Sequence, residues 1–143
     1  MTPSRPTDAD FAAAYSRAWT SDPVELLEFF APDGSYTDVA MDTTYNGRDE
    51  IARFHRWMLK FAPDSVIEFS DACAADGLLY LQWVWSGTFE GALRLPDGSS
   101  VQPTGGNFGV PGVAACRYAA NGELLSHHDY WDLTTLLRQD GTP

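Results

Sequence analysis

The sequence predicts an α+β fold, in which a strongly bent antiparallel sheet forms a cone and N-terminal helices pack on its concave face. Two patterns lead to this fold class. Apolar residues recur at helical spacing before residue 65, and after it they follow the alternation of strands separated by hairpin signals. The chain of 143 residues has the length of one domain, 1–143, with an ordered core of about 7–139.

Three helices are expected before residue 65. Pro6-Thr7-Asp8 marks the start of the first, and Asp22-Pro23 ends it and caps a short second helix. The third follows a loop at 45–48 and stops before Pro63, which cannot continue a helix. His55, beside arginines of this third helix, is expected at the surface or its edge. The expected buried residues are Phe11, Tyr15, Ala18 and Trp19 in the first helix and Ile51, Phe54, Met58 and Phe61 in the third.

Five strands are expected, one early and four after residue 65. They span 35–39, 66–74, 78–89, 110–118 and 124–131. Ala75-Asp76-Gly77 and Asn121-Gly122 are hairpin signals, and Pro111-Gly112 indicates a bulge or bend. Period two places four apolar residues of the 78–89 strand on one face: Leu79, Leu81, Trp83 and Trp85.

Composition narrows the classes of partner. The net charge of −11, with only nine Lys and Arg residues, argues against nucleic acid and against anionic membranes. No apolar run approaches a membrane span and residues 1–6 lack a signal-peptide core, so a cytoplasmic protein is expected. Cys73 and Cys116 are isolated in apolar contexts, which favours buried reduced thiols over a disulfide, a metal site or a nucleophile.

The segment Ser126–Leu133 carries the most informative chemistry. It places His127 and Asp129 among Tyr and Trp residues of an expected strand, where charged groups are rarely buried without a partner or a purpose. Period two puts both on the same face as Trp131. An aspartate among aromatic rings suits proton transfer, because burial disfavours its charged form. The other interpretation is a solvated end strand with alternating faces.

A similar constellation lies earlier, at Tyr36-Thr37-Asp38, where Tyr36 and Asp38 share a face. If Trp83 and Trp85 face the interior of the cone, inward side chains form an aromatic pocket with few carboxylates. Such a pocket suits proton transfer on an apolar small molecule. Asp38 could instead cap the loop that ends its strand. The sequence has no standard metal-ligand spacing, phosphate loop or nucleophile motif, so neither a metal nor a cofactor is expected.

Five short segments are weak motifs individually, but their order and spacing along the chain are specific. They are Glu28–Asp38, Tyr45–Ile51, Asp76–Tyr80, Pro103–Gly105 and His128–Leu133. With these segments the chain resembles the nuclear-transport-factor-2-like superfamily over nearly its whole length. The resemblance is closest to the SnoaL-like polyketide cyclase and limonene-epoxide-hydrolase branches, with ketosteroid isomerase as a further relative. It implies the fold more strongly than the reaction, because this fold hosts isomerases, cyclases, hydratases and non-catalytic binding proteins.

The resemblance implies roles for three residues. Asp129 falls where the cyclases and the epoxide hydrolases keep their catalytic aspartate. Tyr36 matches the water-positioning tyrosine of the epoxide hydrolases. Asp38 stands where those hydrolases have an asparagine and where ketosteroid isomerase has its general base.

The chain also departs from each of these branches. The epoxide hydrolases need an arginine and an aspartate two residues apart on the middle strand, where this chain has Trp83 and Trp85. The isomerase's oxyanion-binding tyrosine aligns nearest Ala14, and its protonated aspartate aligns with Ala114. The cyclases' Thr-His-x-Gly segment reads Thr88-Phe89-Glu90-Gly91 here, without the histidine.

The expected function is a cofactor-independent cyclase or isomerase acting on an apolar, polyketide-like small molecule in natural-product biosynthesis. One of the two aspartates takes a proton, and the other donates one or polarises an oxygen. The catalytic candidates are Asp38, Asp129, Tyr36 and His127, and the substrate-binding candidates are Tyr15, Trp19, Trp83, Trp85, Phe108 and Trp131.

Two alternatives stay open. The first is an epoxide-opening enzyme with Asp129 as base, which needs Arg94 or Arg117 to point inward. The second is a non-catalytic ligand-binding domain. The resemblance further implies a homodimer through the outer face of the sheet, where residues such as Tyr80 and Val84 are more apolar than a solvated face requires.

Overall fold

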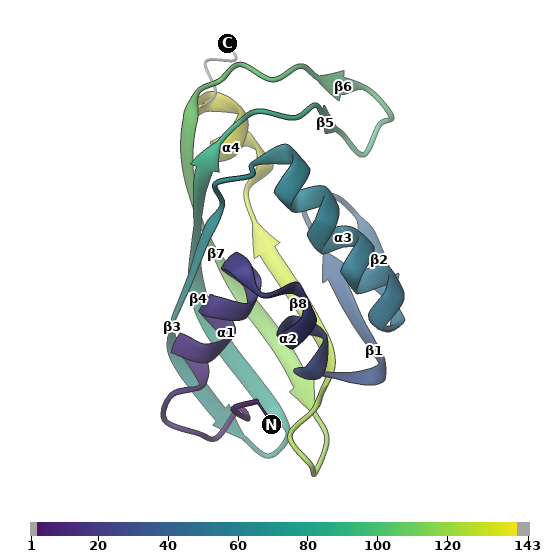
Figure 1. Ribbon diagram of the computed structural model, residues 1–143, viewed down its shortest axis with the longest axis vertical. Coiled ribbons are helices and arrows are strands. Elements are labelled where there is room, and N and C mark those ends of the chain that lie inside the picture. Colours follow the sequence, from purple (N-terminus) through teal and green to yellow (C-terminus); the bar gives the residue numbers. More distant parts are fainter. Residues whose placement is uncertain (1–2, 140–143) are drawn as a thin grey trace.

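A computed structural model describes residues 3–139, which form four α-helices, a six-stranded sheet and a separate two-stranded sheet (Figure 1). The helices are α1 (Phe11–Ser21), α2 (Pro23–Glu28), α3 (Gly47–Phe61) and α4 (Leu133–Gln139). The strands are β1 (Phe30–Asp38), β2 (Thr43–Asn46), β3 (Val66–Ala75), β4 (Leu78–Thr88), β5 (Leu93–Arg94), β6 (Ser100–Val101), β7 (Asn107–Tyr118) and β8 (Leu124–Trp131).

The large sheet has the strand order β2-β1-β8-β7-β4-β3. Neighbouring strands in this sheet are antiparallel, as expected from the hairpin signals, except for β1 and β8, which are parallel. These two strands are far apart in the sequence, so no short hairpin restricts their relative direction. Their register places Tyr36 opposite His127 and Asp38 opposite Asp129. The two segments singled out by their chemistry are therefore adjacent in space.

The concave face of the sheet carries the core, and helices α1, α2 and α3 lie over it (Figure 1). Strand β4 illustrates why the apolar core forms on this face. Its inward residues Leu79, Leu81, Trp83 and Trp85 are buried, while Tyr80 and Val84 between them are exposed. This alternation is the period-two pattern that the sequence predicts. The expected α+β fold class, with a bent sheet and N-terminal helices, is confirmed.

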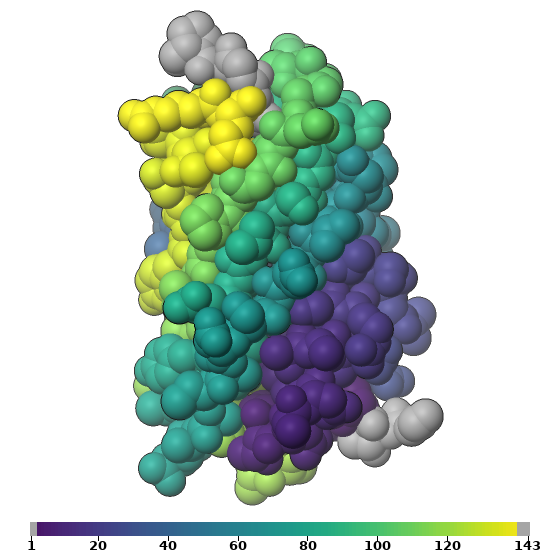
Figure 2. Space-filling view, turned by 90° about the vertical axis from the view of Figure 1, so that its left-hand side faces the viewer, coloured from purple at the N-terminus to yellow at the C-terminus, as the bar shows by residue number. Residues whose placement is uncertain are grey.

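Helix α1 protects the outer edge of the sheet at β3. The Ser16 hydroxyl oxygen accepts a hydrogen bond from the backbone N–H of Phe69 at 2.8 Å, and Thr20 accepts one from Ile67 at 3.0 Å. The space-filling view shows α1, in purple, packed beside the teal strands (Figure 2). Side chains of α1 thus satisfy part of the edge strand that would otherwise be open to pairing.

Local signals explain the starts of α2 and α3. The Asp22 carboxylate accepts a hydrogen bond from Glu25 N–H at 3.0 Å, and Pro23 occupies the first turn of α2. In α3, Glu50 accepts a hydrogen bond from Asn46 N–H at 3.1 Å. No helix in the described residues is long and apolar enough to cross a membrane.

Some elements differ from the sequence expectations. The expected loop at 45–48 instead holds the end of β2 and the first turn of α3, and α4 was not expected. Pro111-Gly112 forms no bulge, since β4 and β7 keep a continuous register through it. The glycine has another role, because a Cβ at Gly112 would lie 2.2 Å from Cζ2 of Trp83. Gly112 therefore leaves room for the inward indole of Trp83.

Two residues lie where the sequence did not place them. His55 is buried rather than at the surface, and its Nε2 donates to the carbonyl of Trp19 at 2.7 Å. Burial lowers its pKa, which matches a neutral ring with the proton on Nε2. Cys73 is exposed rather than buried, because β3 shifts register between Ser70 and Cys73 and the alternation of faces changes there. Cys116 is buried as a free thiol, as expected.

Candidate active site

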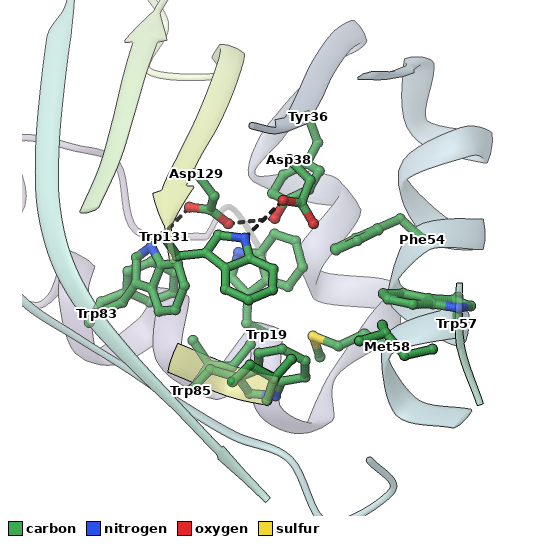
Figure 3. A pocket seen from close by; sticks show the side chains of 14 residues that line it. Trp19, Tyr36, Asp38, Phe54, Trp57, Met58, Trp83, Trp85, Asp129 and Trp131 are labelled. Atoms are coloured by element: carbon green, nitrogen blue, oxygen red, sulfur yellow. Dashed lines mark hydrogen bonds between the residues drawn. The ribbon is translucent and has the colours of Figure 1, made fainter. Parts of the chain in front are cut away.

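A partly open pocket lies between the concave face of the sheet and helices α1, α3 and α4 (Figure 3). We call it the inner pocket. Its walls are mostly aromatic, with two carboxylic acids. It is lined by Trp19, Tyr36, Asp38, Phe54, Trp57, Met58, Ile67, Phe69, Trp83, Trp85, Leu93, Asp129, Trp131 and Leu136.

Asp129 projects from β8 and is held through both carboxylate oxygens. Oδ1 accepts hydrogen bonds from Trp83 Nε1 at 2.9 Å and His127 Nε2 at 2.6 Å, and Oδ2 accepts one from the Tyr36 hydroxyl at 2.5 Å. Burial and the nearby carboxylates of Asp129 and Asp38 raise the pKa of Tyr36 well above its usual 10, so its hydroxyl stays a donor. Asp129 is thus fixed in position by three donors from three directions.

His127 lies behind Asp129 and connects it to α1. The ring is fully buried, and its Nδ1 lies 2.7 Å from the hydroxyl of Tyr15. Burial alone would lower the pKa of His127, but the carboxylate of Asp129 and other neighbouring groups raise it well above 6.5. The imidazole is therefore charged at neutral pH and forms a buried ion pair with Asp129. Burial also raises the pKa of Tyr15, which stays neutral.

Asp38 lies across the pocket at the end of β1 and is held more loosely. Its Oδ1 accepts hydrogen bonds from Trp131 Nε1 at 2.8 Å and from Met41 N–H at 3.3 Å. The backbone N–H of Ala40 also donates a hydrogen bond to this carboxyl, and no side chain in the described part of the chain donates to its Oδ2. Burial, together with the charge of Asp129, raises the pKa of Asp38 to about 6, against the lowering effect of the Trp131 hydrogen bond. This carboxyl can exchange a proton near neutral pH.

Trp83 and Trp85 both face the inner pocket, as the alternation of β4 predicts (Figure 3). Neither indole leaves its N–H unsatisfied, since Trp83 donates to Asp129 and Trp85 donates to the hydroxyl of Ser65 at 2.9 Å. The resemblance puts an arginine and an aspartate at these positions in epoxide hydrolases. Here two indoles fill that space and make the pocket less polar.

A second, more polar pocket adjoins the first and shares Asp38, Phe54 and Trp57 with it. We call it the outer pocket. It lies between the loop that connects β1 to β2 and the hairpin of β5 and β6. The remaining residues that line it are Met41, Asp42, Thr43, Tyr45, Arg94, Leu95, Pro96 and Gly98. Asp38 therefore stands at the junction of an apolar and a polar space.

The structure brings seven of the ten candidate residues to the wall of the inner pocket: Asp38, Asp129, Tyr36, Trp19, Trp83, Trp85 and Trp131. The other three lie behind this wall. His127 and Tyr15 support Asp129 from behind, and Phe108 packs against Trp85 with ring centroids 4.8 Å apart.

Sequence reasoning did not assign seven residues of the wall to the site: Phe54, Trp57, Met58, Ile67, Phe69, Leu93 and Leu136. Phe54 and Met58 were expected in the core, and helical spacing could have placed Trp57 near them. Leu136 belongs to α4, whose signal is Asp132, since its carboxylate accepts hydrogen bonds from Thr134 N–H and the Thr135 hydroxyl. Leu93 lies in a two-residue strand that carries no periodic pattern.

The described residues contain no group of three or more His, Cys, Asp and Glu side chains placed to hold a metal ion. The polar groups that line the inner pocket, Asp38, Asp129 and Tyr36, are of types suited to proton transfer and hydrogen bonding.

A family model described as SnoaL-like polyketide cyclase matches residues 9–140. The chain belongs to this family. The match covers both the β1 and the β8 segments of the site, and it confirms the resemblance seen in the sequence. A search of curated proteins found no match.

Solved structures show the same fold. A hypothetical protein with a ketosteroid isomerase-like fold from Catenulispora acidiphila, in complex with trimethylamine, shares 27% identity over 96% of each chain, with a TM-score of 0.78. IdmH, a candidate polyketide cyclase from Streptomyces antibioticus, shares 24% identity over 97% of this chain and 100% of that one, with a TM-score of 0.74. AclR, a candidate hydroxylase from Streptomyces galilaeus, shares 22% identity over 90% and 80%, with a TM-score of 0.70.

Proposed function

We propose that this family member is a cofactor-independent acid–base enzyme, a cyclase or isomerase that acts on a largely apolar, polyketide-like small molecule. One observation carries the proposal. The carboxyl of Asp38 is 3% exposed, lines an aromatic pocket and has an oxygen, Oδ2, to which no described side chain donates a hydrogen bond. Such a group is available to take a proton from a bound molecule and to return it.

In the proposed reaction, the Asp38 carboxylate removes a proton from a carbon next to a substrate carbonyl. The C–H bond breaks, an O–H bond forms on Asp38, and the electron pair becomes an enolate. In a cyclase, the enolate carbon attacks a second carbonyl of the same molecule and forms a C–C bond. The new alkoxide then takes the proton back from Asp38, so no cofactor or co-reactant is consumed.

The remaining residues prepare the pocket for this chemistry. His127 and Tyr15 are positioning residues, because they act through Asp129 and do not line the pocket. The Tyr36 hydroxyl donates its proton to Asp129 Oδ2 and can accept a hydrogen bond from a hydroxyl group of the substrate. Trp83 and Trp85 exclude water and hold the substrate folded, which favours bond formation within the molecule over hydrolysis.

Proton exchange at carbon tests this proposal without knowledge of the natural substrate. The probe is 2-tetralone, an aromatic ketone with acidic C–H bonds, incubated with the full chain in D₂O and followed by proton NMR. We expect the protein to accelerate deuterium incorporation next to the carbonyl. Replacing Asp38 by Asn should reduce the acceleration by a factor of ~10²–10⁴, since one general base is lost.

Asp42→Asn is the matched control for this experiment. Asp42 lines the outer pocket only, so the same change of charge there should leave the exchange rate close to that of the wild type. If 2-tetralone binds, as judged by tryptophan fluorescence, and no exchange is accelerated, the acid–base proposal is wrong.

Ligand binding without reaction is the second candidate function. It is favoured by the way both oxygens of Asp129 already accept hydrogen bonds from protein donors, which leaves Asp38 as the one carboxyl of the inner pocket with an oxygen to which no described side chain donates. The neighbour from Catenulispora acidiphila, solved in complex with trimethylamine, supports small-molecule binding as a role for this fold. Binding of the probe ketone without exchange would favour this candidate.

Epoxide opening has less support. That reaction needs an inward arginine, and in the described part of the chain no arginine lines the inner pocket. Arg94 lines the outer pocket, and Arg117 is exposed on β7.

We also propose that the protein forms a homodimer through the outer face of the sheet. Tyr80, Val84, Val113 and Tyr130 are each 44–49% exposed there. An apolar face of this kind is unusual for a monomer. Sedimentation at micromolar concentration should give a dimer that Val84→Asp disrupts. Val24→Asp, on α2 and away from this face, should leave it intact; a monomeric wild type contradicts the proposal.

A further inference from the structure

The inner pocket combines aromatic walls with acidic groups. Eight of its 14 lining residues are aromatic, and two, Asp38 and Asp129, are acids. Among the described residues, no lysine or arginine lines it. The charge that a ligand meets in this pocket therefore depends on how each carboxylate is compensated inside the protein.

Asp129 has its own positive partner. His127 Nε2 lies 2.6 Å from Oδ1 in a buried ion pair, and the indole of Trp83 and the hydroxyl of Tyr36 complete its hydrogen bonds. The negative charge of Asp129 is therefore largely balanced before any ligand enters.

Asp38 has no such partner. Its hydrogen-bond donors, the indole of Trp131 and the backbone N–H groups of Met41 and Ala40, are all neutral. Arg94 lines the neighbouring outer pocket but forms no ion pair with Asp38 in the described part of the chain. With a pKa of about 6, Asp38 is mostly ionised at pH 7.5. The pocket thus holds one buried carboxylate that forms no ion pair with a cationic side chain of the described residues.

A buried, unpaired carboxylate is costly, and a positive group beside it removes that cost. Aromatic faces attract organic cations, and their attraction is stronger when the cation is out of water. The net charge of −11 also raises the local concentration of cations around the protein. We propose that the inner pocket selects a ligand that carries an alkylammonium group, tertiary or quaternary, seated between Asp38 and the surrounding aromatic rings.

The inference names the ligand class of the same pocket, and it rests on the proposed function only in placing the ligand there. A substituted ammonium fits this wall better than a metal ion does, because most of the wall is aromatic or aliphatic. Metal ions prefer several oxygen, nitrogen or sulfur ligands, and the described residues provide no cluster of three such side chains.

The test compares choline with 3,3-dimethylbutan-1-ol, in which a carbon replaces the charged nitrogen and the shape is retained. Both are titrated into the full chain at pH 7.5, with binding followed by calorimetry and by tryptophan fluorescence. We expect choline to bind at least about tenfold more tightly than the neutral alcohol. The comparison uses wild-type protein, so it does not depend on the folding of a variant.

Asp38→Asn should abolish the preference for choline while leaving the affinity for the neutral alcohol nearly unchanged. Asp42→Asn, which removes the same charge from the outer pocket, should keep the preference. Equal or tighter binding of the alcohol to the wild type overturns the inference and leaves the proposed function standing. Binding of neither probe overturns the inference too; the exchange assay with 2-tetralone then decides separately whether the proposed function also fails.

Discussion

The two carboxyls of the inner pocket are register partners on neighbouring strands, yet the structure surrounds them differently. Asp129 on β8 receives hydrogen bonds from a histidine, a tryptophan and a tyrosine, and the histidine balances its charge. Asp38 on β1 receives one from an indole and the others from the backbone N–H groups of Met41 and Ala40, so none of its donors is charged. The same residue type at the same level of paired strands thus has two roles, set by what neighbouring elements provide.

Because of this difference, we expect one carboxyl of the site to stabilise the fold and the other to take part in the chemistry. The Asp129 side is a closed network that reaches through His127 to Tyr15 on α1, and it ties β1, β4, β8 and α1 together. The Asp38 side is open, because it lies where the inner and outer pockets meet. We therefore expect changes at Asp129 to appear mainly in stability and changes at Asp38 mainly in activity.

The largest stability effect is expected for Asp129→Asn. The variant leaves the buried imidazole of His127 without its anion, and losing one partner of a buried pair costs about 3–5 kcal/mol. Urea unfolding at pH 7 measures this loss. Asp38→Asn is the matched control, with the same change on the register partner, and it should not show a loss of that size. Equal destabilisation by both substitutions would contradict the division of roles.

A somewhat smaller effect is expected in the pH dependence of the unfolding free energy. The pKa of Asp38 is raised from 3.8 to about 6 in the folded protein, so the folded state holds this proton more tightly than the unfolded state does. The stabilisation of the folded state by this proton is fully present below about pH 4 and is lost as the pH rises through about 6. At roughly 1.4 kcal/mol per pKa unit, the total change is about 2–3 kcal/mol.

The measurement is the difference in unfolding free energy between Asp38→Asn and the wild type, taken at pH 4 and at pH 8. Because the variant lacks this titration, we expect it to gain about 2–3 kcal/mol relative to the wild type over that interval. Other groups titrate in both proteins and cancel in the difference. A constant difference in unfolding free energy between pH 4 and pH 8 would mean that folding does not change the pKa of Asp38.

Local patterns in the sequence predicted much of the architecture. Helical spacing located α1 and α3, and period two placed Trp83 and Trp85 on the inward face of β4, because both rules depend only on neighbours along the chain. The shared face of Tyr36 and Asp38 followed from the same rule. These predictions needed no knowledge of which strands pair.

What the sequence could not provide depends on contacts between distant segments. His55 is buried because the carbonyl of Trp19, 36 residues away, accepts its hydrogen bond. Cys73 is exposed because of a register shift in β3 that no residue pattern announced. The unequal surroundings of Asp38 and Asp129 arise in the same way, from donors on β4, β8 and β1 that meet only in the folded chain.

The smallest expected effect concerns the packing of Trp83, the indole that donates a hydrogen bond to Asp129, against Gly112. A Cβ at Gly112 would lie 2.2 Å from the Trp83 indole, so Gly112→Ala must displace the ring that donates to Asp129 Oδ1. Overpacking of this kind costs about 1–3 kcal/mol. Gly109→Ala, on the same strand with open space around its Cβ, is the control and should be nearly neutral in urea unfolding. Tryptophan fluorescence should change for the first variant alone. If Gly112→Ala matches its control, Trp83 can shift freely, and Asp129 is held less rigidly than its three hydrogen bonds imply.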